Sequence, residues 1–321
     1  MMNKKKLIIL TGPTAVGKTS LSIGLAKSVG GEIISADSMQ VYRHMDIGSA
    51  KIKKEEMQKI PHYLVDILSP REEFNVYLFQ KLAKDAMERI YTNGHIPILV
   101  GGTGFYIQSV LYDIDFTKND DDTAYREELE RLLEEKGAAY LHERLTEVDE
   151  ESAKAIHENN AKRVIRALEY FHLTGTPISE HNRQEREKES PYDFRYFVLN
   201  DDRKLLYRRI EQRVDKMIEA GLVEEVKKLK EMGCKKEDVS MQGLGYKEIL
   251  GYLEGELSFE QAVYLIKRDT RHFAKRQLTW FRRERNVIFV NKPDFGYDED
   301  KILAYMNERI QQENGNDKSV I

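Results

Sequence analysis

The sequence predicts an α/β protein: a P-loop core, in which helices flank a parallel sheet, plus an all-helical insertion domain. Short apolar runs alternate with helical patterns in the first third of the chain, and a glycine-rich loop follows the first run. Only helical patterns occur between Tyr125 and Arg186. Alternating strands and helices are typical of a parallel sheet with right-handed crossovers. With 321 residues, 40% of them hydrophobic, the chain can bury two structural units.

The first third of the chain contains three apolar runs that we expect to be buried strands: residues 7–10, 31–38 and 96–102. A helix is expected over residues 19–29, directly after the glycine-rich loop. A second is expected over residues 75–94, because apolar residues recur there every three or four positions and Asn93-Gly94 gives a C-terminal signal.

The middle of the chain has three helical patterns: residues 125–137, 138–149 and 160–175. Gly137 and Gly175 end two of them. The charged stretch 179–190 is expected to be a solvated loop or a frayed helix. We therefore assign residues 115–195 to a helical insertion domain, and residues 1–114 and 196–310 to a discontinuous P-loop catalytic core.

The C-terminal part returns to the core pattern. Residues 192–200 form a strand, residues 202–233 a long helix or a broken pair of helices, and helical structure continues to about Phe281. Residues 286–290 are the last expected strand. The polar segment 311–321 is expected to be a disordered tail.

Composition excludes several classes of protein. The net charge is −4, so the whole chain is not a basic nucleic-acid coat, and the single Cys234 excludes a disulfide framework and a Cys-rich zinc site within one chain. The apolar run near the N-terminus has four residues, too few for a signal peptide. No run approaches the ~18 apolar residues of a membrane helix. We expect a cytoplasmic protein that does not contact a membrane.

The stretch Gly12-x4-Gly17-Lys18-Thr19 matches the P-loop pattern in full, with an apolar strand before it and a helix after it. The glycines allow backbone N–H groups to converge on phosphate oxygens, and the helix N-terminus adds partial positive charge. Lys18 supplies a point charge, and the Thr19 hydroxyl is suited to Mg²⁺. A phosphate site with magnesium as cofactor is expected here.

The acidic residue that a hydrolytic P-loop protein needs after a buried strand is found only at Asp37. The strand 96–100 ends instead in the turn GGTG (Gly101–Gly104), which offers backbone amides and the Thr103 hydroxyl. This arrangement favours binding of a diphosphate over splitting of ATP. Asp37 itself has two possible roles, as a metal ligand or as a base.

The motifs GPTAVGKT, DSMQVYRHMDIGSAK, GGTGFY, RVIRALE, RIEQRV, GLGYKE and KRQLTWFR together closely resemble those of the tRNA dimethylallyltransferases. The resemblance spans roughly residues 7–285. It implies transfer of a dimethylallyl group from dimethylallyl diphosphate to N6 of the adenosine 3′-adjacent to the anticodon in tRNA. The implied partners are dimethylallyl diphosphate and the anticodon stem-loop of tRNA, bound by a monomer with Mg²⁺.

The resemblance also implies roles for individual residues. Asp37, Lys18, Arg213 and Thr103 would be catalytic, Asp37 as the base, and Thr19 would hold magnesium. The diphosphate would be bound by Gly12, Pro13, Thr14, Ala15, Val16, Gly17, Lys18, Thr19 and Arg213. The tRNA would be contacted by Asp37, Ser38, Met39, Gln40, Thr103, Arg126, Lys162, Arg163, Arg166, Gly245, Tyr246, Lys275, Arg276 and Gln277. Without the resemblance, a surface ion pair of Arg213 with Glu211 or Asp215 would be the favoured interpretation; with it, the diphosphate site is favoured.

A basic segment near the C-terminus supports RNA binding. Residues 267–285 carry eight Lys or Arg residues against two acidic ones, in a chain whose net charge is negative. Lys267, Arg271 and Lys275 recur every four residues, so we expect them on one helix face that follows phosphates. Trp280 and Phe281 are expected in the core rather than as stacking platforms.

Three other functions fit parts of the sequence. An adenylate isopentenyltransferase acting on free AMP or ATP shares the prenyl chemistry but needs no basic face. A small-molecule kinase shares the P-loop. A non-enzymatic nucleotide switch or RNA-binding module would not need Asp37 beside the phosphate loop.

Overall fold

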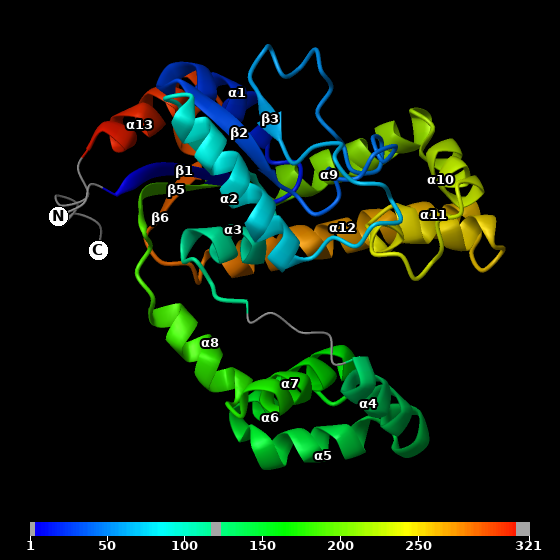
Figure 1. The fold of residues 1–321 in the computed structure, drawn as a ribbon. Helices are drawn as coiled ribbons and strands as arrows, with labels where there is room; N and C mark the ends of the chain where they lie inside the picture. The colour runs from blue at the N-terminus through cyan, green and yellow to red at the C-terminus, as the bar shows by residue number, and fades with distance from the viewer. Residues whose placement is uncertain (1–3, 117–122, 313–321) are drawn as a thin grey trace. The chain divides into compact units, whose positions relative to one another are not determined.

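The computed structural model describes residues 4–116 and 123–312. The chain forms two compact units (Figure 1). The first, the sheet unit, comprises the described residues up to Leu111 and from Pro191 onward. The second, the helical unit, comprises the described residues within Tyr112–Ser190. The predicted fold class, α/β with a parallel sheet flanked by helices, is confirmed.

The sheet has six parallel strands in the order β3-β2-β4-β1-β5-β6. In that order the strands are His62–Tyr63, Gly31–Ala36, Ile96–Gly101, Lys5–Thr11, Tyr192–Asn200 and Val287–Asn291. Strand β1 is central: Ile9 pairs with Leu99 of β4 on one side and with Tyr196 of β5 on the other. All three side chains are fully buried, as expected for a parallel sheet covered on both faces.

Helices cover both faces of the sheet because the chain crosses it in opposite directions. The crossover through α1 (Lys18–Val29) leads from β1 to β2. The crossover through α2 (Val76–Thr92) leads in the opposite direction, from the edge strand β3 to β4. Right-handed crossovers in opposite directions place their helices on opposite faces. Figure 1 shows α1 beside α13 (Glu299–Gln311), and α2 beside α3 (Gly104–Leu111).

Four further helices extend from the sheet and pack on one another: α9 (Arg203–Glu219), α10 (Leu222–Glu231), α11 (Tyr246–Leu253) and α12 (Phe259–Phe281). The expected alternative of a broken helix pair over residues 202–233 is the one found. The break is at Gly221, whose φ of +98° suits glycine and ends the helical path. Two short 3₁₀ helices, η1 (Ser240–Gln242) and η2 (Lys292–Phe295), connect the remaining elements.

The helical unit has a core of its own. It contains α4 (Thr123–Lys136), α5 (Ala138–Val148), α6 (Glu150–Ala155), α7 (Ala161–Thr174) and α8 (Ile178–Glu187). Leu129, Leu141 and Leu145 of the first two helices pack with Val164 and Leu168 of α7. Each of these five side chains is at most 3% exposed.

Several element boundaries differ from the expectations. The charged stretch that we expected to be a loop or a frayed helix contains α8. The core boundary at residue 196 falls inside β5, which starts at Tyr192. Strand β3 and helices α3 and α13 were not anticipated. The expected disordered tail begins within α13, and its residues 313–321 lie outside the described residues.

Candidate active site and nucleic-acid surface

The carboxyl ends of the parallel strands bring the candidate residues to one edge of the sheet. Strand β1 leads into the P-loop, β2 into Asp37, and β4 into the GGTG turn. Strand β6, at the sheet edge, leads into Lys292. Ligands of open parallel α/β sheets bind at this edge, so the topology collects groups that are distant in sequence.

The P-loop depends on two glycines for its shape. Gly12 has φ of +146°, and a Cβ there would lie 2.5 Å from the carbonyl oxygen of Leu199. Gly17 has φ of +93°. Because both positions exclude ordinary side chains, the backbone can curl between β1 and α1 and direct its N–H groups inward.

Lys18 folds back over the loop that precedes it. Its Nζ donates to the carbonyl oxygens of Gly12 and Pro13, each at 3.0 Å. Burial and, to a smaller extent, the Arg213 guanidinium lower the pKa of Lys18 to about 8, although the Asp37 carboxylate acts in the opposite direction. The three charged groups therefore share one local field.

Arg213 of α9 reaches the P-loop, where its NH1 donates to Thr14 Oγ1 at 3.1 Å. The alternative of a surface ion pair does not hold, because Glu211 pairs with Arg271 at 2.7 Å and Asp215 with Lys267 at 2.5 Å. Burial lowers the pKa of the Arg213 guanidinium, and the carboxylate of Asp37 opposes that shift. Arginine at this place is suited to hold a phosphate group.

Asp37 closes a tight turn directly after β2. Its Oδ1 accepts hydrogen bonds from the backbone N–H groups of Met39 at 2.8 Å and Gln40 at 3.3 Å. The turn fixes the carboxylate beside the P-loop cations. The Thr103 N–H donates to Ala36 O at 3.3 Å, which ties the GGTG turn to the end of β2.

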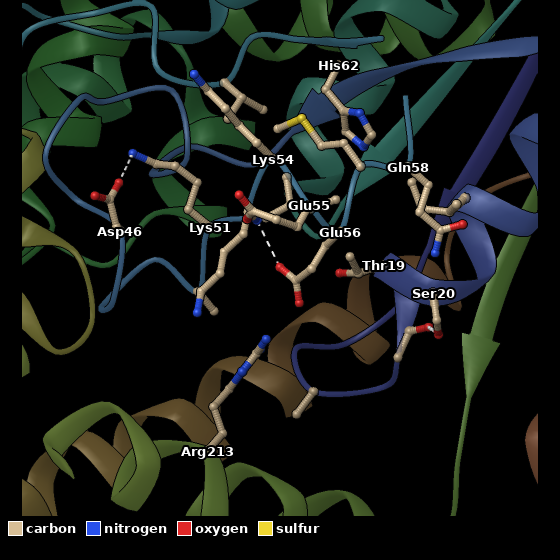
Figure 2. A pocket seen from close by; sticks show the side chains of 18 of the residues that line it. Thr19, Ser20, Asp46, Lys51, Lys54, Glu55, Glu56, Gln58, His62 and Arg213 are labelled. Carbon is tan, nitrogen blue, oxygen red and sulfur yellow. Dashed lines mark hydrogen bonds and ion pairs between the residues drawn. The ribbon is translucent and has the colours of Figure 1, made fainter. Parts of the chain in front are cut away.

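A cavity of about 1410 Å³ opens beside the P-loop. Figure 2 shows Arg213 pointing into it from α9, opposite Thr19 and Ser20 at the start of α1. Lys51 and Asp46 form an ion pair at 2.6 Å on a further wall, which is made by the segment 46–58. The cavity combines phosphate-binding groups with apolar side chains such as Ile23 and Met217.

Gln277 joins the P-loop to the GGTG turn. Its Oε1 accepts from the N–H of Thr14, and its Nε2 donates to the carbonyl oxygen of Gly102, both at 2.9 Å. The side chain is buried and both ends of its carboxamide are used within the protein. Helix α12 thus turns Gln277, which we expected to contact RNA, inward towards the strand ends.

Tyr246 and Gly245, for which we also expected a contact with RNA, are buried. The Tyr246 ring fills the space left by Gly48, where a Cβ would lie 2.5 Å from it. Its hydroxyl donates to Glu225 at 2.8 Å and accepts from Ser49 N at 3.1 Å. The motif is thus part of the support for the cavity wall.

Glu225 of α10 completes that support. Its carboxylate accepts from three successive backbone N–H groups, those of Asp46, Ile47 and Gly48, at 2.8 to 3.0 Å. Charge-assisted bonds of this kind are the stronger class of hydrogen bond. Sequence reasoning missed Glu225, because an acidic residue on an amphipathic helix carries no signal for a distant partner.

The exposed basic surface of α12 is smaller than expected. Lys267 and Arg271 face α9, where they form the ion pairs described above. Lys275 and Arg276 are exposed and line a groove of about 380 Å³ together with His272, Thr279, Trp280 and Arg283. This groove and its bordering charges, the α12 groove, are suited to a polyanion.

The two aromatic residues at the end of α12 differ in burial. Phe281 is fully buried, as expected for a core residue. Trp280 is 37% exposed and forms an edge-to-face pair with Phe105, which is 42% exposed, at 6.3 Å between ring centroids. An exposed aromatic pair therefore borders both the α12 groove and the GGTG turn.

The helical unit carries the second predicted basic cluster on α7. Lys162 and Arg163 are exposed, and Arg166 follows on the next turn. The opposite face of α7 is buried in the unit's core. Arg126 of α4 lies near Glu130 at 3.3 Å and Glu169 at 3.7 Å, so its charge is partly compensated.

Comparisons with known proteins agree with this geometry. The family model described as IPP transferase matches residues 40–284, and the model described as isopentenyl transferase matches residues 5–71. The chain belongs to the IPP transferase family. A curated tRNA dimethylallyltransferase of Lachnoclostridium phytofermentans is 65% identical over 292 residues, covering 91% of this chain and 93% of that relative.

Solved structures of IPP transferases show the same fold. The full-length tRNA isopentenylpyrophosphate transferase of Bacillus halodurans has a TM-score of 0.72 and 44% identity, covering 96% of this chain and 97% of that one. The tRNA Δ(2)-isopentenylpyrophosphate transferase of Staphylococcus epidermidis has a TM-score of 0.70, also with 44% identity, covering 96% and 99%. A eukaryotic dimethylallyltransferase studied acting on tRNA has a TM-score of 0.80 and 29% identity, covering 97% and 81%.

Two further properties of this IPP transferase concern metals and membranes. Within residues 4–116 and 123–312, no group of three or more His, Cys, Asp or Glu side chains is arranged to hold a metal ion. Across those same ranges, none of the helices combines the length and apolar character that a bilayer crossing requires.

Proposed function

We propose that this IPP transferase moves a dimethylallyl group from dimethylallyl diphosphate to N6 of the adenosine 3′-adjacent to the anticodon in tRNA, and releases diphosphate. One observation carries the proposal: Lys18, Arg213 and Asp37 meet at the carboxyl edge of the sheet in a chain of this family. We also propose that the protein acts as a monomer. The 65% identical curated relative is a tRNA dimethylallyltransferase.

The P-loop holds the leaving group. When the allylic C1–O bond breaks, its electron pair stays with the diphosphate, so negative charge grows on the bridging oxygen. Backbone N–H groups of residues 12–17, the Lys18 ammonium and the Arg213 guanidinium stabilise that charge. Thr14, to which Arg213 donates, keeps the guanidinium against the loop.

Asp37 activates the nucleophile. The N6 amine forms the new bond to C1 and gives a proton to the Asp37 carboxylate, so the charges and atoms balance. A base must lie within hydrogen-bonding reach of that amine. The turn made with Met39 and Gln40 fixes the carboxylate for this role, and it also explains how these residues and Ser38 would border the adenosine. Thr103 lies on the adjoining strand end.

The protein offers an oxygen donor for magnesium at the P-loop, the Thr19 hydroxyl. The Thr19 hydroxyl borders the cavity, and the described residues give no cluster of carboxylates there. Mg²⁺ is commonly held by one or two protein groups, water and substrate phosphates. Thr19 would hold the ion together with the diphosphate, and the ion would supply further charge neutralisation at the leaving group.

The RNA is held through its phosphates. Lys275 and Arg276 border the α12 groove, and Lys162, Arg163 and Arg166 form the basic face of α7. We propose that both surfaces contact the anticodon stem-loop. An adenosine must leave its stack before N6 can react, and extrusion costs least from a single-stranded loop.

A transfer assay tests the proposal against its main rival. The chain is incubated with labelled dimethylallyl diphosphate and either bulk tRNA or AMP. Label in tRNA, at the adenosine 3′ of the anticodon, is the expected result. Label in AMP alone would identify an adenylate isopentenyltransferase, and turnover of ATP with neither acceptor would identify a kinase or an ATPase.

A further inference from the structure

A second lysine approaches the P-loop from the end of the edge strand β6. Lys292 directly follows β6 and begins η2, and it is only 7% exposed. Its Nζ donates to the carbonyl oxygen of Val16 at 3.3 Å, and a Cβ on Gly17 would lie 3.0 Å from it. Gly17 is also one of the residues that line the cavity. The ammonium therefore lies against the backbone of the P-loop, next to a residue of the cavity wall.

The charge of Lys292 has no carboxylate partner among the described residues, where its only hydrogen bond is the one to Val16. Lys51, another buried lysine, shows the usual solution: it pairs with Asp46 at 2.6 Å and also contacts Asp66. Burying an ammonium without an opposite charge is costly. A compensating negative charge is therefore expected close to Lys292 when a ligand is bound.

We propose that Lys292 is a positioning residue for the diphosphate, and that the bound diphosphate supplies this missing negative charge. The inference rests on the proposed function, in which the P-loop holds a diphosphate. The ammonium acts through the loop: it holds the Val16 carbonyl outward, which directs the adjoining N–H groups towards the cavity. Its field also adds to that of Lys18 at the P-loop.

The proposal makes two predictions of opposite sign for Lys292→Met. Removing an uncompensated buried charge leaves the free protein at least as stable as the parent. Losing that charge beside the loop weakens diphosphate binding by roughly tenfold or more, because a unit charge even about 10 Å from an anion contributes about that factor at an effective dielectric constant of about 20. A lysine that merely braced the loop would have the reverse pattern, with lower stability and little change in affinity.

Calorimetric titration with inorganic diphosphate and with dimethylallyl diphosphate, in the presence of Mg²⁺, measures the affinities for the full chain. Thermal unfolding of the same samples measures stability. Lys301→Met is the matched control, because it removes one exposed charge from α13, where the side chain is 70% exposed. Lys292→Arg keeps the charge and serves as the second variant.

The expected result is weaker binding for Lys292→Met alone, a raised KM for dimethylallyl diphosphate, an unchanged KM for tRNA, and recovery in Lys292→Arg. Parental affinity in Lys292→Met overturns the inference. If Lys292→Met does not fold, the Lys292→Arg variant tests the inference instead. A folded Lys292→Arg protein that binds diphosphate tenfold more weakly than the parent shows that the positive charge at this position is not what strengthens diphosphate binding. Failure of the parent itself to bind either diphosphate contradicts the proposed function instead.

Discussion

Replacing Asp37 by Asn separates the charge of this residue from its structural role. The Asn side chain keeps a carbonyl oxygen where Asp37 Oδ1 accepts from Met39 N and Gln40 N. The turn after β2 is therefore retained, and we expect a stability change within about 0.5 kcal/mol. What the substitution removes is the negative charge and the ability to accept a proton.

The expected magnitude follows from that loss. A positioned base accelerates a reaction roughly 10²- to 10⁴-fold, so the transfer step should slow by this factor. At 1.36 kcal/mol for each tenfold change in rate, the activation free energy rises by about 2.7 to 5.4 kcal/mol. Diphosphate binding should change little at about pH 7. Although losing Asp37 lowers the pKa of Lys18 below its value of about 8, Arg213 keeps its charge.

Single-turnover transfer, measured across a Mg²⁺ series, is the assay. A slow rate at every Mg²⁺ concentration supports the base. A rate that added Mg²⁺ rescues, with weakened diphosphate binding, would make Asp37 a metal ligand. Asp202→Asn is the control, because Asp202 caps α9 through the same kind of turn and lies outside the cavity lining. Near-parental transfer by Asp37→Asn throughout the series would refute both roles.

Three further outcomes are expected. Dimethylallyl diphosphate binds the protonated form of Lys18, so its affinity should be complete below pH 8 and fall by up to tenfold for each pH unit above it; a flat calorimetric profile from pH 7 to 9.5 would contradict this. Charge reversal at Lys275 and Arg276 should lower the slope of log Kd for tRNA against log salt by about 0.7 to 0.9 for each lost contact, without changing diphosphate binding. Tyr246→Phe should lower the free energy of unfolding in urea by about 1 to 3 kcal/mol, because Glu225 and a buried backbone amide each lose a partner; weaker tRNA binding at parental stability would instead favour an RNA-contact role for Tyr246.

The sequence was sufficient for the parts of the fold that follow from local pattern. Apolar runs and glycine signals located most strands and helices, because a buried parallel strand and an amphipathic helix each require a recognisable spacing. The two-residue strand β3 is too short to show such a pattern. Helix α13 was missed because its polar residues conceal Ile302 and Met306, the two side chains it buries.

The candidate site was predicted less evenly. The P-loop is a continuous motif, so its residues could be named from the sequence. An RNA contact is expected for Gln277 and Tyr246 because they stand in motifs of the family. That both side chains are buried could not be read from the motifs, because the direction of a side chain depends on what packs against its helix. The four-residue spacing of Lys267 and Arg271 did predict a shared face, although it could not show that α9 covers it.

Helix α12 has an inner face, which carries Gln277, and an outer face, and the two contact different parts of the site. On the outer side, Lys275 and Arg276 border the groove that we assign to RNA. On the inner side, one carboxamide holds Thr14 of the P-loop and Gly102 of the GGTG turn. A displacement of α12 by bound RNA would therefore reach the diphosphate site through two hydrogen bonds. Linkage makes such an effect reciprocal: the factor by which RNA changes diphosphate affinity equals the factor by which diphosphate changes RNA affinity. The helix that recognises one substrate would thus couple the affinities of the two, whichever binds first.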